Sequence, residues 1–141
     1  MKKLKKHLLT KDLVIGLGEI GNPILKITSR GFPTVGYDID PKLMDKKKYR
    51  KFENIPTILM HVCIPFSKRF ENTVIKIEKK YTPRAIVIHS TISVETTKAL
   101  QKKLDIPIIY SPIRGVHKRM LKDLKRYTKF YSVFDWAPHS N

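Results

Sequence analysis

The chain has 141 residues, of which 41% are hydrophobic and 29% charged, and its 29 lysines and arginines against 12 aspartates and glutamates give a formal net charge of +17. This composition is typical of one globular domain with a hydrophobic core, and it excludes extensive disorder, a collagen-like chain and, because Cys63 is the single cysteine, a disulfide-rich scaffold. No apolar run approaches the roughly 20 residues needed to cross a bilayer, and "MKKLKKHLLTKD" lacks the apolar middle of a signal peptide, so we expect a cytoplasmic protein with no membrane partner.

Strands and helices are predicted to alternate along the chain. The apolar run at 12–16 is typical of a buried parallel strand that stops at a glycine turn, and 19–30 has helical spacing, with Gly31 expected to end the helix in a left-handed conformation. A second strand is predicted at 33–38. The basic segment at 41–54 is either a short helix or an irregular edge. A third strand follows at 57–65, and Ser67 is expected to cap a helix over 68–80.

Two further buried strands are predicted at 84–90 and 106–112, with a helix capped by Ser93 between them and a last helix over 118–127. This alternation predicts an α/β fold with a doubly wound parallel sheet, the Rossmann NAD(P)-binding fold, in a single domain. We expect a basic N-terminal extension at 1–10, the dinucleotide-binding domain at 11–130 and an irregular or truncated tail at 131–141.

The positive charge is concentrated in "KKLKK" (2–6), "KKKYRK" (46–51) and "KRMLKDLKR" (118–126). Such an excess favours phosphate-bearing partners through long-range attraction and counterion release. The clusters also alternate with apolar residues that would face a core, so a solvated surface is the simpler interpretation. Few aromatic residues lie near them to stack bases, which disfavours nucleic acid as a partner without excluding it.

The glycines of "GLGEIG" follow the GxGxxG spacing between a predicted strand and a predicted helix. A dinucleotide pyrophosphate needs main-chain N–H donors at a helix N-terminus and no side chain in its path. The first glycine allows the tight turn, the second lets the backbone approach the phosphates, and the third lets the helix pack on the strand. The cofactor-binding residues predicted in this turn are Gly16, Leu17, Gly18, Glu19, Ile20 and Gly21.

Asp38 ends the second predicted strand, about 20 residues after the glycine turn, where dinucleotide-binding folds carry an acidic residue. Its carboxylate is expected to accept hydrogen bonds from the adenosine ribose and to repel the 2′-phosphate of NADP. NAD is therefore the expected cofactor, with NADP less favoured. Lys42 and the lysines at 46–48 leave the alternative open, because a mobile lysine could partner that phosphate.

Four segments resemble, in order and spacing, the cofactor domain of two related groups of dehydrogenases: "GLGEIGNP" (16–23), "VCIP" (62–65), "HSTISVETTKAL" (89–100) and "SPIRG" (111–115). One group is the β-hydroxyacid dehydrogenases, which include the 3-hydroxyisobutyrate and 6-phosphogluconate enzymes. The other is the UDP-glucose/GDP-mannose dehydrogenases. The resemblance covers about 12–126 and implies a domain of an NAD-dependent oxidoreductase that acts on a CH–OH group.

The resemblance also implies further site residues. Those expected beneath the adenosine and the nicotinamide-side ribose are Ile64, Pro65 and Phe66, and those expected near the nicotinamide are Ser90 and Thr91. The residues expected to face an anionic substrate, such as a sugar nucleotide or a hydroxy acid, are Ser111, Arg114 and Gly115. For Ser90 and Thr91 the alternative is a helix-entry turn that hydrogen-bonds its own backbone.

The chain departs from both groups in ways that bear on activity. Ile113 stands where the sugar-nucleotide enzymes have a glutamate, and Arg114-Gly115 only partly matches the glycine-rich turn of the other group. Both groups take a catalytic lysine, and the sugar-nucleotide enzymes a nucleophilic cysteine, from a following helical domain that is absent from this sequence. We therefore identify no catalytic residue and expect turnover to need a helical partner domain or a homodimer. The alternative is a non-catalytic module that binds NAD or nucleic acid.

Cys63 is not expected to replace that nucleophile, because it lies inside a predicted buried strand, where a thiol is inert. His61, His89 and His117 show no metal-ligand spacing, so no metal is predicted. His89 precedes Ser90 and is either a pocket residue or, in the favoured interpretation, a strand-end histidine with satisfied hydrogen bonds.

Overall fold

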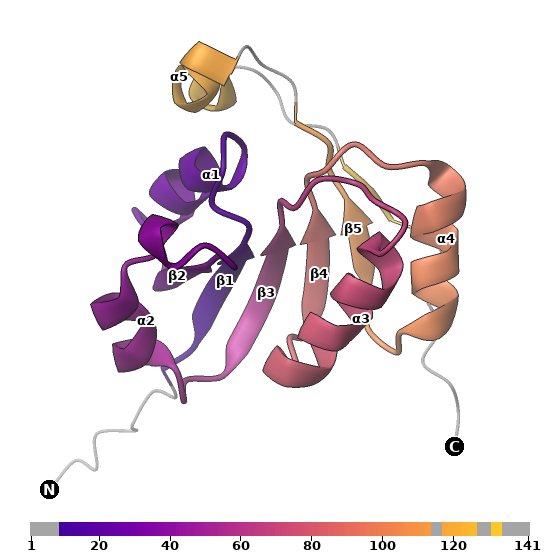
Figure 1. Cartoon of the computed structure of the whole chain (residues 1–141), viewed down its shortest axis with the longest axis horizontal. Helices are drawn as coiled ribbons and strands as arrows, with labels where there is room; N and C mark the ends of the chain where they lie inside the picture. The colour runs from indigo at the N-terminus through magenta and orange to yellow at the C-terminus, as the bar shows by residue number, and fades with distance from the viewer. Residues whose placement is uncertain (1–8, 114–116, 127–130, 134–141) are drawn as a thin grey trace, which may run out of the picture.

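The computed structural model describes residues 9–113, 117–126 and 131–133 and has a six-stranded sheet at its centre (Figure 1). In spatial order the strands are β2 (Thr34–Tyr37), β1 (Lys11–Ile15), β3 (Thr57–Val62), β4 (Ala85–Ile88), β5 (Ile108–Tyr110) and β6 (Ser132–Val133). The first five run parallel, and β6 pairs with β5 in the antiparallel direction. The predicted α/β class with a doubly wound, Rossmann-like sheet is confirmed.

The helices are α1 (Gly21–Thr28), α2 (Lys46–Phe52), α3 (Phe70–Tyr81), α4 (Val94–Lys103) and α5 (Met120–Arg126), and 3-10 turns lie at Pro41–Leu43 and His117–Arg119. The crossover from β1 to β2 runs in one direction across the sheet, and the next three crossovers run in the other. Because such connections are right-handed, α1 lies on one face of the sheet and α2, α3 and α4 on the other. Figure 1 shows α5 beside α1, and the two helices are in contact. None of the helices in the described ranges is long and apolar enough to span a membrane.

Each face of the sheet has its own core because alternate strand residues point to opposite faces. Beneath α2, α3 and α4, the fully buried Leu13, Met60 and Ile86 of the strands belong to one cluster with Phe70 and Val74 of α3. A smaller cluster lies on the face of α1 and α5, and its buried residues are Val14, Leu17, Ile24 and Cys63. Removal of these side chains from water is the main favourable contribution to folding. The two cores also hold the ends of the strands in place.

Two of the predicted helix ends are wrong. α1 ends at Thr28, and Gly31 lies beyond it in a turn without a left-handed backbone conformation. α3 begins at Phe70, and Ser67 does not cap it. The Ser67 hydroxyl instead accepts the N–H of Arg69 in a turn that precedes the helix. Both errors concern helix ends, which depend on the path of the adjoining loop.

Two other helix starts are capped by side chains, one of which was predicted. The Ser93 hydroxyl accepts the N–H of Thr96 at 3.1 Å and caps α4 as expected. The basic segment at 41–54 contains α2, and its helix begins because the Asp45 carboxylate accepts the N–H of Lys48 at 3.0 Å. Of the two alternatives for this segment, the structure has the short helix.

A buried lysine ties the connection after α2 to the first strand. The Lys11 ammonium, on a residue that is 2% exposed, donates to the carbonyl oxygens of Phe52, Glu53 and Ile55 at 2.8, 3.2 and 2.7 Å. The last carbonyls of a helix have no partner within the helix, so Lys11 supplies the missing donors. Burial lowers the pKa of this ammonium.

Candidate functional site

A cleft of 1020 Å³ opens at the carboxyl ends of the first four strands. Its walls come from the turn after β1, the end of β2, the loop after β3, the segment after β4 and one face of α3. In the sheet, β1 lies between β2 and β3, so the chain reverses its direction of travel at this point. Open α/β sheets bind ligands in the crevice at such a switch point.

The first and third glycines of the turn are required by the fold. Gly16 has φ of 88°, a left-handed conformation that side chains disfavour. A Cβ atom at Gly21 would overlap the carbonyl oxygen of Gly16, so α1 can start this close to β1 only with glycine there. Leu17, between them, is 5% exposed and packs in the smaller core. Leu17 and Gly21 therefore shape the turn from beneath and do not line the cleft.

The second glycine is different, because the fold itself does not require it. Gly18 is exposed, lines the cleft, and would place an added Cβ in open space, with no protein atom within 4 Å. The helix that follows has Ile20 at its N-cap, with no side-chain hydrogen bond to the first-turn amides. Main-chain N–H groups at the start of α1 thus have room for an anion. The turn fits a pyrophosphate group.

Asp38 holds the turn against the end of β2. Its Oδ2 accepts the N–H of Leu17 at 2.7 Å, and its Oδ1 accepts the N–H of Asp40 at 2.8 Å. The side chain is half-buried and lines the cleft. Because each carboxylate oxygen can accept more than one hydrogen bond, Asp38 retains capacity for ligand hydroxyls.

The loop after β3 and the segment after β4 are joined by a hydrogen bond. The buried Ser90 hydroxyl donates to the carbonyl oxygen of Ile64, so this hydroxyl bonds the neighbouring loop and not its own turn. Pro65, Phe66 and Thr91 are exposed around this link and line the cleft. The bond holds two predicted cofactor segments together.

The predicted position of Cys63 inside a strand is wrong. Cys63 does not lie inside β3 but is the first residue after it, on the cleft wall, although its side chain is buried at 8% exposure.

The wall of the cleft at α3 was not predicted from the sequence. Arg69, Thr73, Lys76 and Lys80 recur at i, i+4, i+7 and i+11 and line the cleft. The Lys80 ammonium lies 5.3 Å from the centroid of the Tyr37 ring and 5.1 Å from that of Tyr81. The helical spacing was the available signal, but a row of charged residues at that spacing is equally typical of a solvated face.

The substrate-side residues are not brought to this cleft in the described part of the chain. Ser111 is the first residue after β5, is 4% exposed and does not line the cleft. Arg114 and Gly115 lie outside the described residues.

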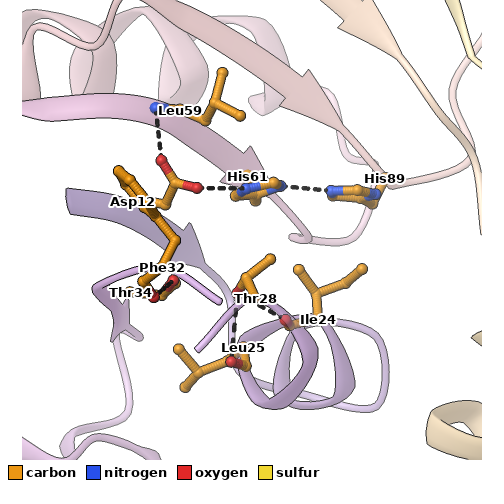
Figure 2. Close-up of polar contacts among 9 residues, drawn as sticks. All are labelled: Asp12, Ile24, Leu25, Thr28, Phe32, Thr34, Leu59, His61 and His89. Atoms are coloured by element: carbon orange, nitrogen blue, oxygen red, sulfur yellow. Dashed lines mark hydrogen bonds and ion pairs between the residues drawn. The ribbon is translucent and has the colours of Figure 1, made fainter. Parts of the chain in front are cut away.

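His89 points into the sheet face beneath α1 and not into the cleft. Its Nε2 is 2.9 Å from Nδ1 of His61, and the two rings lie end to end and nearly in one plane, with an interplanar angle of 15° (Figure 2). On the other side of His61, Nε2 lies 3.8 Å from the Asp12 carboxylate, which also accepts the N–H of Leu59 (Figure 2). His89 is thus hydrogen-bonded to its neighbour through Nε2 at the end of β4 and does not line the cleft. Within the described ranges, no three His, Cys, Asp or Glu side chains are arranged to hold a metal ion.

Comparison with known proteins identifies similar folds but no sequence relative. No family model matches the chain, and no curated protein matches it. A reductive aminase from Aspergillus terreus, solved with NADPH and ethyl levulinate, is 11% identical, with a TM-score of 0.52 over 79% of this chain and 43% of that one. A chain described as an oxidoreductase from Pseudomonas putida KT2440 is 12% identical, with a TM-score of 0.51 over 79% of this chain and 42% of that one. The present chain thus spans less than half the length of either.

The resemblance inferred from the sequence motifs is confirmed at the level of the fold, because the chain shares the Rossmann-like α/β architecture of these neighbours.

Proposed function

We propose that the cleft binds a nicotinamide dinucleotide and that the chain is the cofactor-binding domain of an NAD(P)-dependent oxidoreductase. The observation that carries this proposal is Gly18, a glycine that the fold does not require, at a place where a phosphate needs an open backbone. The uncapped start of α1 beside it supports the same ligand. Structures of the Aspergillus terreus reductive aminase, which share the fold, were solved with NADPH or a related cofactor.

Different residues of the cleft would contact different parts of the dinucleotide. Main-chain N–H groups at 18–20 would hold the pyrophosphate, and Asp38 would accept the hydroxyls of the adenosine ribose. Ile64, Pro65 and Phe66 offer an apolar surface to the nucleosides, and Ser90 and Thr91 lie toward the nicotinamide end of this arrangement. When bound, the nicotinamide ring supplies a carbon that accepts or gives a hydride.

We further propose that NAD(H) binds more tightly than NADP(H), because the charge of Asp38 opposes a 2′-phosphate. Turnover depends on a helical partner domain or a second chain that brings the acid or base. The substrate is anionic, a hydroxy acid or a sugar nucleotide, and contacts the Ser111–Gly115 segment.

Calorimetric titration with NADH tests the dinucleotide site. The wild type should bind, and Gly18→Val should abolish binding without lowering the melting temperature, because its side chain occupies the phosphate path and its Cβ atom has no protein atom within 4 Å. Gly31→Val is the matched control, since Gly31 also has open space around its Cβ position but does not line the cleft. The proposal fails if the wild type binds neither NADH nor NADPH, or if Gly18→Val binds as the wild type does.

A further inference from the structure

We propose that Lys76 and Lys80 of α3 bind a phosphate group on the adenosine ribose, so that the cleft accepts NADP(H) as well as NAD(H). In this proposal the ratio of the two affinities is set by these lysines, which attract the phosphate, against Asp38, which repels it. The inference rests on the proposed dinucleotide site and concerns its specificity. It identifies residues that the glycine-turn motif does not contain.

The two lysines are placed as a pair on the cleft wall. They are one helical turn apart on α3, so their side chains leave the same face of the helix. Both are exposed and line the cleft that Asp38 also lines. Among the described residues, no carboxylate forms an ion pair with either cleft lysine.

Lys80 is held near the adenosine end before any ligand arrives. Its ammonium lies over the rings of Tyr37 and Tyr81, and Tyr37 directly precedes Asp38 at the end of β2. The Tyr81 hydroxyl is 2.8 Å from the hydroxyl of Tyr49, which fixes the ring on which Lys80 rests. Because the ammonium is already positioned by the two aromatic faces, less side-chain entropy is lost when it meets an anion.

The charges around the cleft favour an additional phosphate on this wall. The lining cations are Arg69, Lys76 and Lys80, against the carboxylates Glu19 and Asp38. Main-chain N–H groups already donate to both oxygens of Asp38, which partly offsets its negative charge. A phosphate on the ribose would therefore enter a cleft lined by three cations, two of them on α3, and two carboxylates.

The test is calorimetric titration of the full chain with NADH and with NADPH. Lys76→Met/Lys80→Met keeps the apolar stems and removes both charges, and it should weaken NADPH binding about tenfold or more while NADH binding changes less than about threefold. Lys76→Arg/Lys80→Arg should retain the wild-type ratio. The control is Lys79→Met/Lys98→Met, which removes two exposed charges that do not line the cleft and should change both affinities by less than about threefold.

Equal losses of NADH and NADPH affinity in the Lys76→Met/Lys80→Met variant would overturn the inference. The lysines would then attract both cofactors equally, without a specific contact to the phosphate on the ribose. A matching loss in the control would overturn it as well. A wild type that binds NADH but not NADPH refutes this inference and leaves the proposed function standing. A wild type that binds neither refutes both.

Discussion

The main-chain N–H of Leu17 donates to the carboxylate of Asp38, with 2.7 Å between the nitrogen and Oδ2. This bond joins the glycine turn after β1 to the end of β2, so one side chain both shapes the glycine turn and lines the cleft. Loss of Asp38 should therefore affect stability and binding together, and the two effects can be separated by measurement.

Asp38→Ala should lower the free energy of unfolding by about 1–3 kcal/mol, because it leaves the N–H groups of Leu17 and Asp40 without their acceptor. It should also weaken NADH binding and shift the affinity ratio toward NADPH. Urea unfolding followed by circular dichroism and calorimetric titration measure the two effects. Asp45→Ala is the control, since Asp45 caps α2 away from the cleft and its loss should leave the NADH affinity unchanged. An Asp38→Ala protein with wild-type NADH affinity would contradict the assigned role.

The buried histidines allow a prediction about tautomers. Because a carboxylate oxygen of Asp12 faces Nε2 of His61 at 3.8 Å, we expect the proton of neutral His61 on Nε2. Nδ1 of His61 is then the acceptor, and the Nε2–H of His89 is the donor across the 2.9 Å contact. When the rings are neutral, both should therefore give the nitrogen-15 shift pattern of the Nε2–H tautomer. A pattern of the Nδ1–H tautomer for His61 would contradict this arrangement.

The losses in the free energy of unfolding caused by replacing His61 and His89 singly should add up to more than the loss caused by replacing both. His61→Leu leaves Asp12 and His89 buried beside an apolar side chain, and we expect a loss of about 1–3 kcal/mol in the free energy of unfolding. The double variant His61→Leu/His89→Leu should lose less than the sum of the two single variants, since the second change removes a group that the first left without its partner. Urea unfolding of the four proteins gives the coupling, and strict additivity would show that the contact contributes nothing.

The strands were predictable because their chemistry is local. Buried parallel strands are apolar on both faces, so β1, β3 and β4 appear in the sequence as apolar runs that stop at glycine or proline or before a polar residue. The switch point then follows from the right-handed crossovers, and with it the position of the glycine turn. β6 was not predicted, because Ser132–Val133 is a pair of exposed residues with no apolar pattern.

The remainder of the site depends on tertiary structure. Lys76 and Lys80 have the same local pattern as lysines on a solvated helix face, and only the packing of α3 against the sheet places them on the wall of the cleft that Asp38 also lines. Likewise Gly31 is a good helix terminator by composition, yet α1 ends at Thr28. Sequence patterns therefore predicted the strands and the glycine turn, whereas the α3 wall of the cleft depends on tertiary packing.

The hydrogen-bonded side chains of Tyr49 in α2 and Tyr81 in α3 predict how stability changes at alkaline pH. Burial raises the pKa of Tyr49 and of Tyr81, and the hydrogen bond to Tyr81 raises that of Tyr49 further. The folded protein thus keeps these protons at a pH where unfolded tyrosines, with a pKa near 10, lose them. The stabilisation is complete below about pH 10 and is lost as the pH rises above it.

Urea unfolding at about pH 8 and about pH 11 measures this loss. Tyr49→Phe should show a smaller decrease in the free energy of unfolding between the two pH values than the wild type, because one titrating group is gone. Tyr131→Phe changes a ring that is 72% exposed and should keep the wild-type decrease. Identical decreases in the wild type and Tyr49→Phe would contradict the prediction.

The last prediction concerns Lys11, whose ammonium donates to three carbonyl oxygens after α2. Lys11→Met fills a similar volume but removes the ammonium donor from those carbonyls, of which only that of Phe52 also accepts a main-chain N–H in this segment, from Ile55, so we expect the free energy of unfolding to fall by about 2 kcal/mol. The amides of α2 should also exchange with solvent faster, since the segment loses its tie to β1. Lys47→Met, on the exposed side of α2, should change stability by no more than about 0.5 kcal/mol. Equal stabilities for Lys11→Met and Lys47→Met would show that Lys11 does not anchor the connection between α2 and β3, which leads into the strand whose carboxyl end forms the cleft.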